Sequence, residues 1–490
     1  SAAIPAPFWR TGSTRPAAST LTLDGLTVIT GKNNSGKTTV GKTLYAMLDA
    51  VSDLQEKGWI DRSSYVERQL NTVEVTLMEG FRLFNQEATP EFSKYPALCT
   101  MLFDDFDMRI PWKEMEEYAH KVEEELREID SSLMDPYRRE RRIRRFDEKA
   151  KVWRIDRVPG NFDIQRQQAL EILEQTFTAL NRDPELIDYA RESINQTLRT
   201  EFSGQIQPVR APNVVSLVDL SEAGENSPVY FHFSVKDNSL VNDGDPVFWS
   251  IPVKKAYMVD DPFILDAPVR RPLLRNSSRE MEDSILDLSR IQPHNQKLRQ
   301  ALREPATVNI FEQTVLDEDL KTIKAQMDSV VSGSFEFSNE SDYYIQNGAK
   351  IKLSNMATGS KMFSIIKILL EKGKLDRTAM LILDEPEAHL HPQWQNAFAE
   401  VIVLLVKELG VHVLLTTHSP NFMLALDAHM RKHSLADRTN FYQTETIKGG
   451  FVQYQCVNDD MGRIYDDFLR YLSEMKELRD RCLYGGEAER

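Results

Sequence analysis

The residues from Leu381 to Pro392, LILDEPEAHLHP, join an apolar run to a group of acidic residues and histidines. The run Met380–Leu383 is apolar throughout, which is typical of a parallel strand buried on both faces. It ends abruptly in two adjacent carboxylates, Asp384 and Glu385. Carboxylates at the end of a buried strand are costly unless a positive group meets them. The stretch therefore predicts a cation site at the carboxyl end of a strand, together with a phosphate-binding element elsewhere in the chain.

That phosphate-binding element lies near the start of the sequence. Residues 31–38 read GKNNSGKT, the complete G-x-x-x-x-G-K-[ST] pattern of a phosphate loop. Before it, 21–30 alternates like a strand and breaks at Asp24-Gly25, a hairpin turn signal, and a helical pattern follows to Ala50. Backbone N–H groups of such a loop surround phosphate oxygens at a helix N-terminus. We therefore expect ATP to be bound by Gly31, Asn33, Asn34, Ser35, Gly36, Lys37, Thr38 and Thr39.

Four side chains are expected to carry the chemistry. Thr38 and Asp384 would be the ligands of Mg²⁺, and Glu385 would polarise the attacking water as a catalytic base. His418 follows a second buried strand, VHVLLTT, and from there it can reach a γ-phosphate. The alternative for His418 is a histidine satisfied within the turn at the strand end. Glu385 and His418 are thus the predicted catalytic residues.

The composition describes a large protein with an acidic balance. The chain has 490 residues, a formal net charge of −15 and 41% hydrophobic residues, enough for two or three structural units. This charge argues against general attraction to nucleic acid, so any contact with DNA needs a local basic patch. The three cysteines lack C-x-x-C spacing, and no apolar run approaches the roughly 20 residues of a membrane span. We expect a cytoplasmic protein that does not bind membranes.

The middle of the sequence predicts a helical insertion. The segments 113–129 and 138–155 are highly charged and separated by a break at Pro136, which suggests two helices joined as a hairpin. The stretch from Arg138 to Arg157 is the most basic of the chain. Two interpretations stay open for it. One is a contact with nucleic acid or a protein partner, and the other is a solvated helix face paired with the acidic helix before it.

The last third alternates between strand and helix patterns. A small antiparallel meander is expected at 334–353 and a terminal hairpin around Gly449-Gly450. Helices are expected at 316–331, 362–370, 398–409 and 462–481. Alternating strands and helices with a phosphate loop after the first strand predict an α/β fold, with a mainly parallel sheet and the nucleotide at its carboxyl edge.

Four motifs, in this order, resemble the ATP-binding-cassette (ABC) ATPase head of the SMC, RecF and OLD superfamily. They are GKNNSGKT, ATGSK, LILDEPEAHLHPQWQ and LLTTHSP. As in that superfamily, a long insertion separates Lys37 from Asp384. The sequences of these motifs most resemble those of stand-alone AAA-type ATPases of bacterial anti-phage operons, of the Septu and PARIS kind. The motifs cover about 21–43 and 353–426, so the resemblance does not extend to the middle of the chain.

The resemblance implies an ATPase that works as a homodimer. The family's signature contacts the nucleotide of the opposite subunit, so two heads would enclose ATP between them, with 387–391 as a loop facing the partner. In this chain Thr358 stands where a serine is usual, and the glycine before Gly359 is absent. The signature positions are Thr358, Gly359, Ser360 and Lys361. The family's glutamine loop is not placed, and the candidates for it are Gln165, Gln167 and Gln168.

Two functions are carried forward. The first is a regulatory ATPase in anti-phage defence, which would sense DNA or phage material and control a separate effector, a nuclease. The chain has no nuclease signature of its own. The second is a RecF-like DNA-binding ATPase of repair or recombination. The expected divisions are a head segment at 1–105, the helical insertion at 106–215, rejoining strands and a helix at 216–305, and a C-terminal lobe at 306–490.

Overall fold

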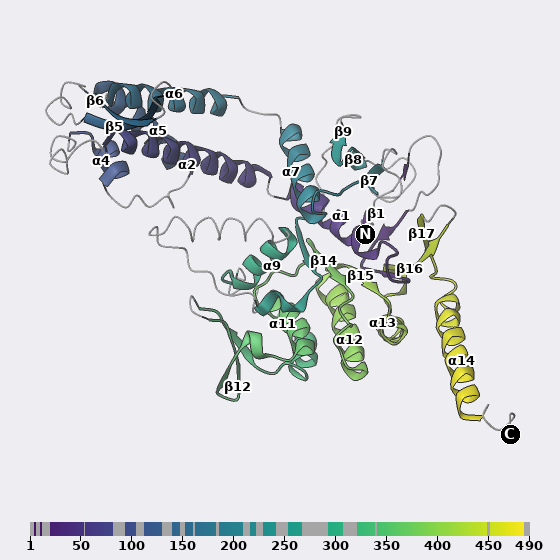
Figure 1. The fold of residues 1–490 in the computed structure, drawn as a ribbon. Helices are drawn as coiled ribbons and strands as arrows, with labels where there is room; N and C mark the ends of the chain where they lie inside the picture. Colours follow the sequence, from purple (N-terminus) through teal and green to yellow (C-terminus); the bar gives the residue numbers. More distant parts are fainter. Residues whose placement is uncertain are drawn as a thin grey trace. The chain divides into compact units, whose positions relative to one another are not determined.

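The protein consists of two compact units, one formed by Ser1–Ser52 with Ala190–Arg490 and one formed by Asp53–Tyr189 (Figure 1). The second unit starts and ends earlier than the insertion expected at 106–215. Its earlier start reflects a long helix, Leu54–Phe81, which belongs to this unit. The computed structural model describes residues 4–5, 10–11, 20–52, 54–81, 94–103, 112–129, 140–147, 152–159, 162–182, 186–208, 216–221, 229–241, 253–266, 293–306, 321–338, 341–447 and 451–484.

The first unit is built on a six-stranded sheet. Its strand order is β10–β14–β15–β4–β16–β17, and all neighbours are parallel except β16 and β17. Parallel strands end at the same edge of a sheet, so the segments that follow β4, β14 and β15 meet there. The strands are β10 (Lys255–Val259), β14 (Ala379–Asp384), β15 (His412–Thr417), β4 (Leu26–Thr30), β16 (Thr439–Thr446) and β17 (Val452–Cys456).

Strand β14 is buried on both faces, as its apolar run predicts. Met380 and Ile382 belong to a core shared with helix α1 (Lys37–Val51). Leu381 and Leu383 belong to a second core on the other face. The helices of that second face are α11 (Thr358–Glu371), α12 (Pro392–Leu409) and α13 (Pro420–Lys432). Because a strand's side chains alternate and each buried aliphatic side chain contributes about 1.5–3 kcal/mol, this strand anchors the carboxylates that follow it.

Most elements expected in the last third are confirmed. The meander consists of β11 (Ser334–Glu336), β12 (Tyr343–Gln346) and β13 (Ala349–Lys352), and β16 pairs with β17 as the terminal hairpin. Of the helix expected at 316–331, residues 321–328 are helical and 307–320 lie outside the described ranges.

The hairpin expected at Asp24-Gly25 is wrong. The short strand β3 (Thr22–Leu23) pairs with β1 (Ile4–Pro5), not with β4. The physical reason is that both edges of β4 are already paired, one with β15 and one with β16. The glycine still makes the turn, with Gly25 at φ 60°.

The second unit is mainly helical, as expected for the insertion. Its helices pack around a core that includes Val73, Leu126 and Leu173. The carboxylate of Glu125 accepts hydrogen bonds from the backbone N–H groups of Ala97 (3.0 Å) and Leu98 (2.8 Å), which caps a helix start. The helices are α2 (Leu54–Phe81), α4 (Pro96–Phe103), α5 (Trp112–Glu128) and α6 (Phe162–Leu180).

The helix expected at 138–155 is wrong, because the basic stretch forms a β-hairpin. Strands β5 (Glu140–Asp147) and β6 (Val152–Pro159) pair antiparallel, with Phe146 opposite Trp153. Within β6, residues 153–156 (WRID) alternate apolar and charged residues, a pattern that fits a strand. Because the stretch forms strands, it is not the charged helix face that was one of its two interpretations.

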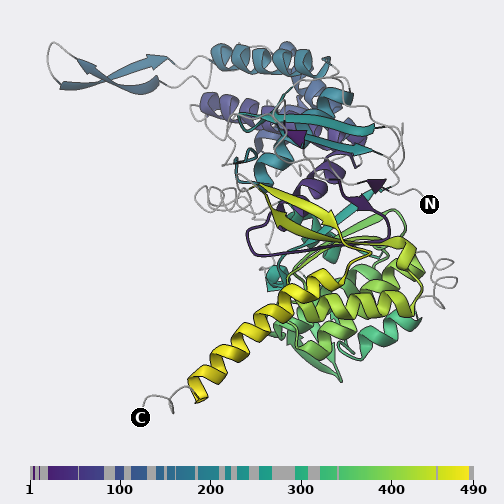
Figure 2. The same ribbon diagram turned by 90° about the vertical axis from the view of Figure 1, so that its right-hand side faces the viewer.

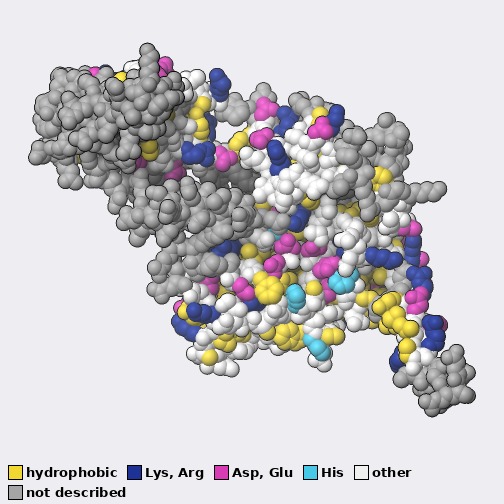
Figure 3. Space-filling view, in the orientation of Figure 1, with side chains coloured by type: hydrophobic (Ala, Val, Ile, Leu, Met, Phe, Trp, Pro, Cys, Tyr) yellow, Lys and Arg dark blue, Asp and Glu magenta, His cyan; other side chains and the backbone are white. Residues whose placement is uncertain are grey.

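Helix α14 (Gly462–Tyr484) closes the described chain and extends away from the sheet of the first unit (Figure 2). Five large apolar side chains along it are 40–58% exposed, and Figure 3 shows apolar and charged side chains mixed along this helix. These five are Leu469, Tyr471, Leu472, Met475 and Leu478. Exposed apolar groups of this extent mark interaction surfaces. Within the described ranges, no helix is both long and apolar enough to cross a membrane.

A buried charged triad ties three elements of the first unit together. His294, on α9 (Pro293–Arg303), is fully buried between Glu201 of α7 (Leu186–Glu201) and Asp260, which follows β10. Its Nδ1 lies 2.7 Å from Glu201 Oε2 and its Nε2 lies 3.0 Å from Asp260 Oδ1. Burial lowers the pKa of His294, but the two carboxylates outweigh burial and raise this pKa to about 9.

This triad makes stability depend on pH in the alkaline range. A histidine whose pKa is raised on folding contributes fully below its unfolded value of about 6.5, and the contribution is lost as pH rises through about 9. The difference corresponds to about 3 kcal/mol. We expect urea unfolding of the wild type to lose this amount between pH 6 and pH 10, and His294→Gln to lack the dependence. His389→Gln, an exposed histidine, is the control, and an identical pH dependence in all three proteins would contradict the assignment.

Candidate active site

The phosphate loop connects β4 to α1 and is shaped by its glycines. Asn34 at φ 61° and Gly36 at φ 80° adopt the left-handed conformation that turns the chain into the helix. A Cβ on Gly31 would lie 1.7 Å from Oγ1 of Thr444, because β16 approaches the loop closely. Glycine at position 31 is therefore required by a neighbouring strand as well as by the loop itself. Thr39 lies exposed in the first turn of α1.

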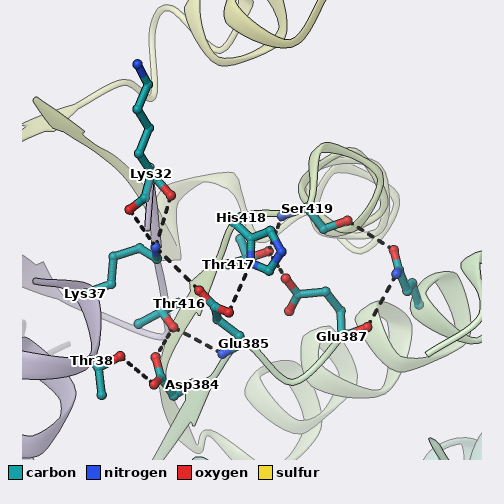
Figure 4. A network of polar contacts seen from close by, with 12 residues as sticks. Lys32, Lys37, Thr38, Asp384, Glu385, Glu387, Thr416, Thr417, His418 and Ser419 are labelled. Carbon is teal, nitrogen blue, oxygen red and sulfur yellow. Dashed lines mark hydrogen bonds and ion pairs between the residues drawn. The ribbon is translucent and has the colours of Figure 1, made fainter. Parts of the chain in front are cut away.

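The side chain of Lys37, the first residue of α1, folds back into the phosphate loop. It is 5% exposed, and its Nζ donates hydrogen bonds to the carbonyl oxygens of Gly31 (3.0 Å) and Lys32 (3.1 Å). The same Nζ lies 3.5 Å from Oε1 of Glu385 (Figure 4). The strand order brings this lysine and this glutamate together, since only β15 lies between β4 and β14. The ammonium is thus held where it can meet an anion in the loop.

Thr38 and Asp384 meet as the sequence predicts. The Thr38 hydroxyl donates a hydrogen bond of 2.6 Å to Oδ2 of Asp384, and the Thr416 hydroxyl donates to Oδ1 (Figure 4). A hydroxyl and a carboxylate are oxygen ligands of the kind that Mg²⁺ prefers. In the loop beside them, the Ser35 hydroxyl is buried and has no hydrogen-bond partner among the described residues, which fits a site built to receive phosphate oxygens. The residues present therefore fit magnesium and a phosphate chain.

Glu385 has a backbone conformation that a non-glycine residue rarely adopts, with φ 49°. Its N–H donates to the carbonyl oxygen of Thr416 (3.1 Å), which holds the turn against β15. The side chain lies between two cationic or polar partners, because Oε1 faces Lys37 and Oε2 lies 3.1 Å from Nδ1 of His418 (Figure 4). Strain of this kind is kept where the surroundings fix a functional side chain. One Glu385 oxygen therefore points at Lys37 of the phosphate loop and the other at His418.

Glu387 corrects part of the expectation for residues 387–391. It is 1% exposed and accepts a hydrogen bond from the Thr417 hydroxyl, so it does not face outward. Burial raises the pKa of its carboxyl group, and its Oε2 has no hydrogen-bond partner in the part of the chain that the structure describes. Ala388, His389 and His391 are exposed. Glu387 thus links the turn after β14 to the end of β15, and the residues that follow it form the outer surface of the loop.

A cavity of about 1280 Å³ opens at the phosphate loop. Gly31, Asn33, Ser35 and His418 line it, together with β16 and with five residues of α14. The α14 residues are Arg463, Ile464, Arg470, Tyr471 and Glu474. They are more than 400 positions from the loop, and the sequence describes their helix only as charged, so no local signal could have placed them here. The cavity is larger than the roughly 300–1,000 Å³ typical of ligand sites.

The four signature positions have different surroundings. Thr358, Gly359 and Ser360 form the start of α11, where a Cβ on Gly359 would lie 3.1 Å from the His389 carbonyl oxygen. Lys361 is 2% exposed, and its Nζ is ion-paired with Asp266 at 2.5 Å. Lys361 therefore holds the start of α11 in the core and is not presented to a nucleotide. The glutamines proposed for the glutamine loop, at 165, 167 and 168, lie on α6 in the second unit.

Residues 250–425 match the family described as "AAA domain, putative AbiEii toxin, Type IV TA system". A search of curated proteins found no match.

Three solved structures are similar in part. The Smc head domain of Pyrococcus furiosus with an extended coiled coil is 11% identical, with 96% of this chain and all of that chain covered and a TM-score of 0.36. An SmcHead bound to the C-winged helix domain of ScpA is 12% identical, covers 93% and 96%, and scores 0.33. The SMC head domain of Thermotoga maritima is 13% identical, covers 50% and 74%, and scores 0.27.

The parallel sheet order, the phosphate loop after β4 and the paired carboxylates after β14 together form an α/β nucleotide site at the carboxyl edge of the sheet. Residues 250–425, which match the AAA family, contribute β14, β15 and the helices between them and after them. The phosphate loop and this match together indicate a site for ATP binding and hydrolysis.

Proposed function

We propose that this protein binds ATP with Mg²⁺, hydrolyses it, and uses the cycle to join and release two copies of its first unit. The observation that carries the proposal is the convergence of Lys37, Thr38, Asp384, Glu385 and His418 at one edge of the sheet. These side chains come from three strand ends that are far apart in the sequence. Each has the chemical type that phosphoryl transfer to water requires.

Each of these residues has its own role in the proposed reaction. Lys37 would bind phosphate oxygens in place of its present carbonyl and carboxylate partners. Thr38 and Asp384 would hold magnesium, which supplies positive charge against the phosphate chain when it is bound. Glu385 takes the proton of the attacking water on a carboxylate oxygen, and this oxygen is held in place by the strained turn. His418, 3.1 Å from Glu385, orients that carboxylate and lies at the cavity wall.

A dimer cycle and the control of an effector both need surfaces for a partner. The start of α11, where Thr358 and Ser360 are half-buried, would meet the nucleotide of a second copy, and the exposed residues of 388–391 would contact that copy beside it. The apolar side chains of α14 supply a separate surface for a protein partner. By resemblance to the anti-phage ATPases we propose a cytoplasmic regulator of a nuclease effector, with DNA or phage material as its trigger.

Sedimentation of the full chain tests the proposal. We expect a monomer without nucleotide, a dimer with ATP and Mg²⁺, and a return to monomer as phosphate is released. Purification from native cells with and without an α14 variant, Leu472→Lys, then tests the partner surface. An ATPase whose sedimentation ignores ATP would contradict the dimer cycle, and equal capture of partners by both proteins would contradict the role of α14.

The β5–β6 hairpin favours DNA binding as a second candidate function. Its register places Arg142 opposite Arg157 and Arg145 opposite Arg154. This register places four arginines in two pairs of facing strand positions, and clustered positive charge of this kind binds DNA phosphates. Binding of the full chain to duplex DNA, with an affinity that falls steeply between about 50 and 200 mM salt, would support a RecF-like role. No binding to duplex DNA would leave the regulatory function as the better reading.

A further inference from the structure

Two histidines and a glutamate form a cluster between helices α12 and α13, outside the site described above. Glu400 belongs to α12 and His429 to α13, and His433 is the residue that ends α13. His429 and His433 are four residues apart, so they lie on the same side of their helix. Each of the three residues offers one ligand atom, and these atoms lie within 4.8 Å of one another. The packing of the two helices therefore brings three metal-ligand types to one point.

The distances in the cluster fit a metal's coordination shell. Nδ1 of His429 and Nε2 of His433 each lie 3.6 Å from Oε1 of Glu400. This is longer than an N–H···O hydrogen bond, which spans about 2.7–3.2 Å. Zinc binds nitrogen and oxygen ligands at about 2.0–2.2 Å in tetrahedral sites, which separates two ligand atoms by about 3.4 Å. Each histidine nitrogen is thus spaced from the Glu400 oxygen like two ligands of one small cation.

The histidine nitrogens that face Glu400 have no other role within the described structure. Nδ1 of His429 and Nε2 of His433 are buried, and neither has a hydrogen-bond partner. Nε2 of His429, on the other side of the ring, lies 3.1 Å from Oδ1 of Asn396. That oxygen only accepts, so Nε2 carries the ring proton and Nδ1 presents its lone pair to the cluster. Metal-bound histidines are oriented by an outer acceptor in this way.

We propose that Glu400, His429 and His433 bind a divalent transition-metal ion of the zinc class. Two imidazoles and a carboxylate form a donor set that zinc accepts with a fourth position left for water. Lys432 is the group that competes with the ion, because its Nζ lies 2.6 Å from Oε1 of Glu400. Its side chain is 59% exposed and can move into solvent. The bound ion would fasten α13, which begins directly after His418 and Ser419, to α12.

Zinc titration of the chelator-treated full chain, in competition with a fluorescent zinc indicator, tests the site. We expect one zinc ion bound per wild-type chain and at least about 100-fold weaker binding by His433→Ala, since even an outer partner changes metal affinity about 10–100-fold. Asn396→Ala, which removes that outer partner, should weaken binding about 10-fold. Lys432→Ala should tighten it. His120→Ala changes an exposed histidine of the second unit and should leave zinc affinity unchanged.

The visible absorption of bound Co²⁺ gives a second readout, which does not depend on the zinc affinity measurement. Four-coordinate Co²⁺ absorbs visible light far more strongly than the hydrated ion, so the wild type should show an intense band that His433→Ala lacks. Equal zinc affinity of the wild type and His433→Ala, or a cobalt spectrum identical to that of the aqueous ion, would overturn the proposal. Should His433→Ala fail to fold, the opposite shifts expected for Asn396→Ala and Lys432→Ala decide the question.

Discussion

The Glu385→Gln variant is expected to hydrolyse ATP about 10²–10⁴-fold more slowly than the wild type. The amide cannot take the proton of the attacking water, whereas the backbone bonds that hold the turn to Thr416 remain. The variant should bind ATP at least as tightly, because its side chain no longer attracts Lys37, which lies 3.5 Å from the carboxylate. ATP-bound dimers should therefore accumulate. Single-turnover phosphate release and sedimentation with ATP measure the two effects.

Glu408→Gln, near the end of α12, is the matched control because it makes the same chemical change away from the site. It should retain the wild-type rate and the wild-type response to ATP. If Glu385→Gln hydrolysed ATP at the rate of this control, Glu385 would not be the base. If it lost hydrolysis but sedimented alike with and without ATP, the catalytic role would stand and the dimer cycle would be wrong.

Lys37→Ala should weaken ATP binding by about 10²–10⁴-fold. A buried ammonium that contacts two phosphates makes two charge-assisted hydrogen bonds, each worth about 1.5–3 kcal/mol, and their sum gives this range of dissociation constants. The lysine is 5% exposed and already directed into the loop, so little ordering is needed when phosphate binds. Calorimetric titration with a non-hydrolysable ATP analogue measures the change.

Lys42→Ala provides the comparison, since Lys42 lies on the same helix one and a half turns further on. Its affinity for the analogue should stay within about twofold of the wild type, which is the scale of an exposed or distant charge. Equal affinities of Lys37→Ala and the wild type would mean that the nucleotide does not enter this loop. Weak binding by both lysine variants would point to a damaged α1 and not to a lost phosphate contact.

The parts of the site predicted from the sequence are those that local chemistry determines. The loop at 31–38 needs glycines at the turns and a lysine at the helix start, and these requirements are visible in eight consecutive residues. The meeting of Thr38 with Asp384 follows from strand ends that share one edge of a parallel sheet. The apolar run of β14 also predicts its burial on both faces.

The parts that the sequence did not predict depend on distant partners. Lys361 stands in a signature-like segment, but Asp266, 95 residues earlier, holds its ammonium in the core. The α14 residues at the cavity have no sequence pattern that relates them to the phosphate loop. In the basic stretch, the many charged residues favoured a helix, although the alternation of apolar and charged residues at 153–156 fits the strand β6. The histidines at 429 and 433 have helical spacing, but their carboxylate partner comes from another helix.

The contacts of Lys37 have a consequence for which nucleotide the site prefers. The ammonium already has two carbonyl oxygens and the Glu385 carboxylate within reach, so the affinity of a ligand reflects the contacts it forms minus those it displaces. A triphosphate would restore as many contacts as it displaces if its terminal phosphate reached Lys37. A diphosphate, one phosphate shorter, would restore fewer. Discrimination between ATP and ADP would thus be set partly by the hydrogen bonds and the ion pair that Lys37 makes within the protein.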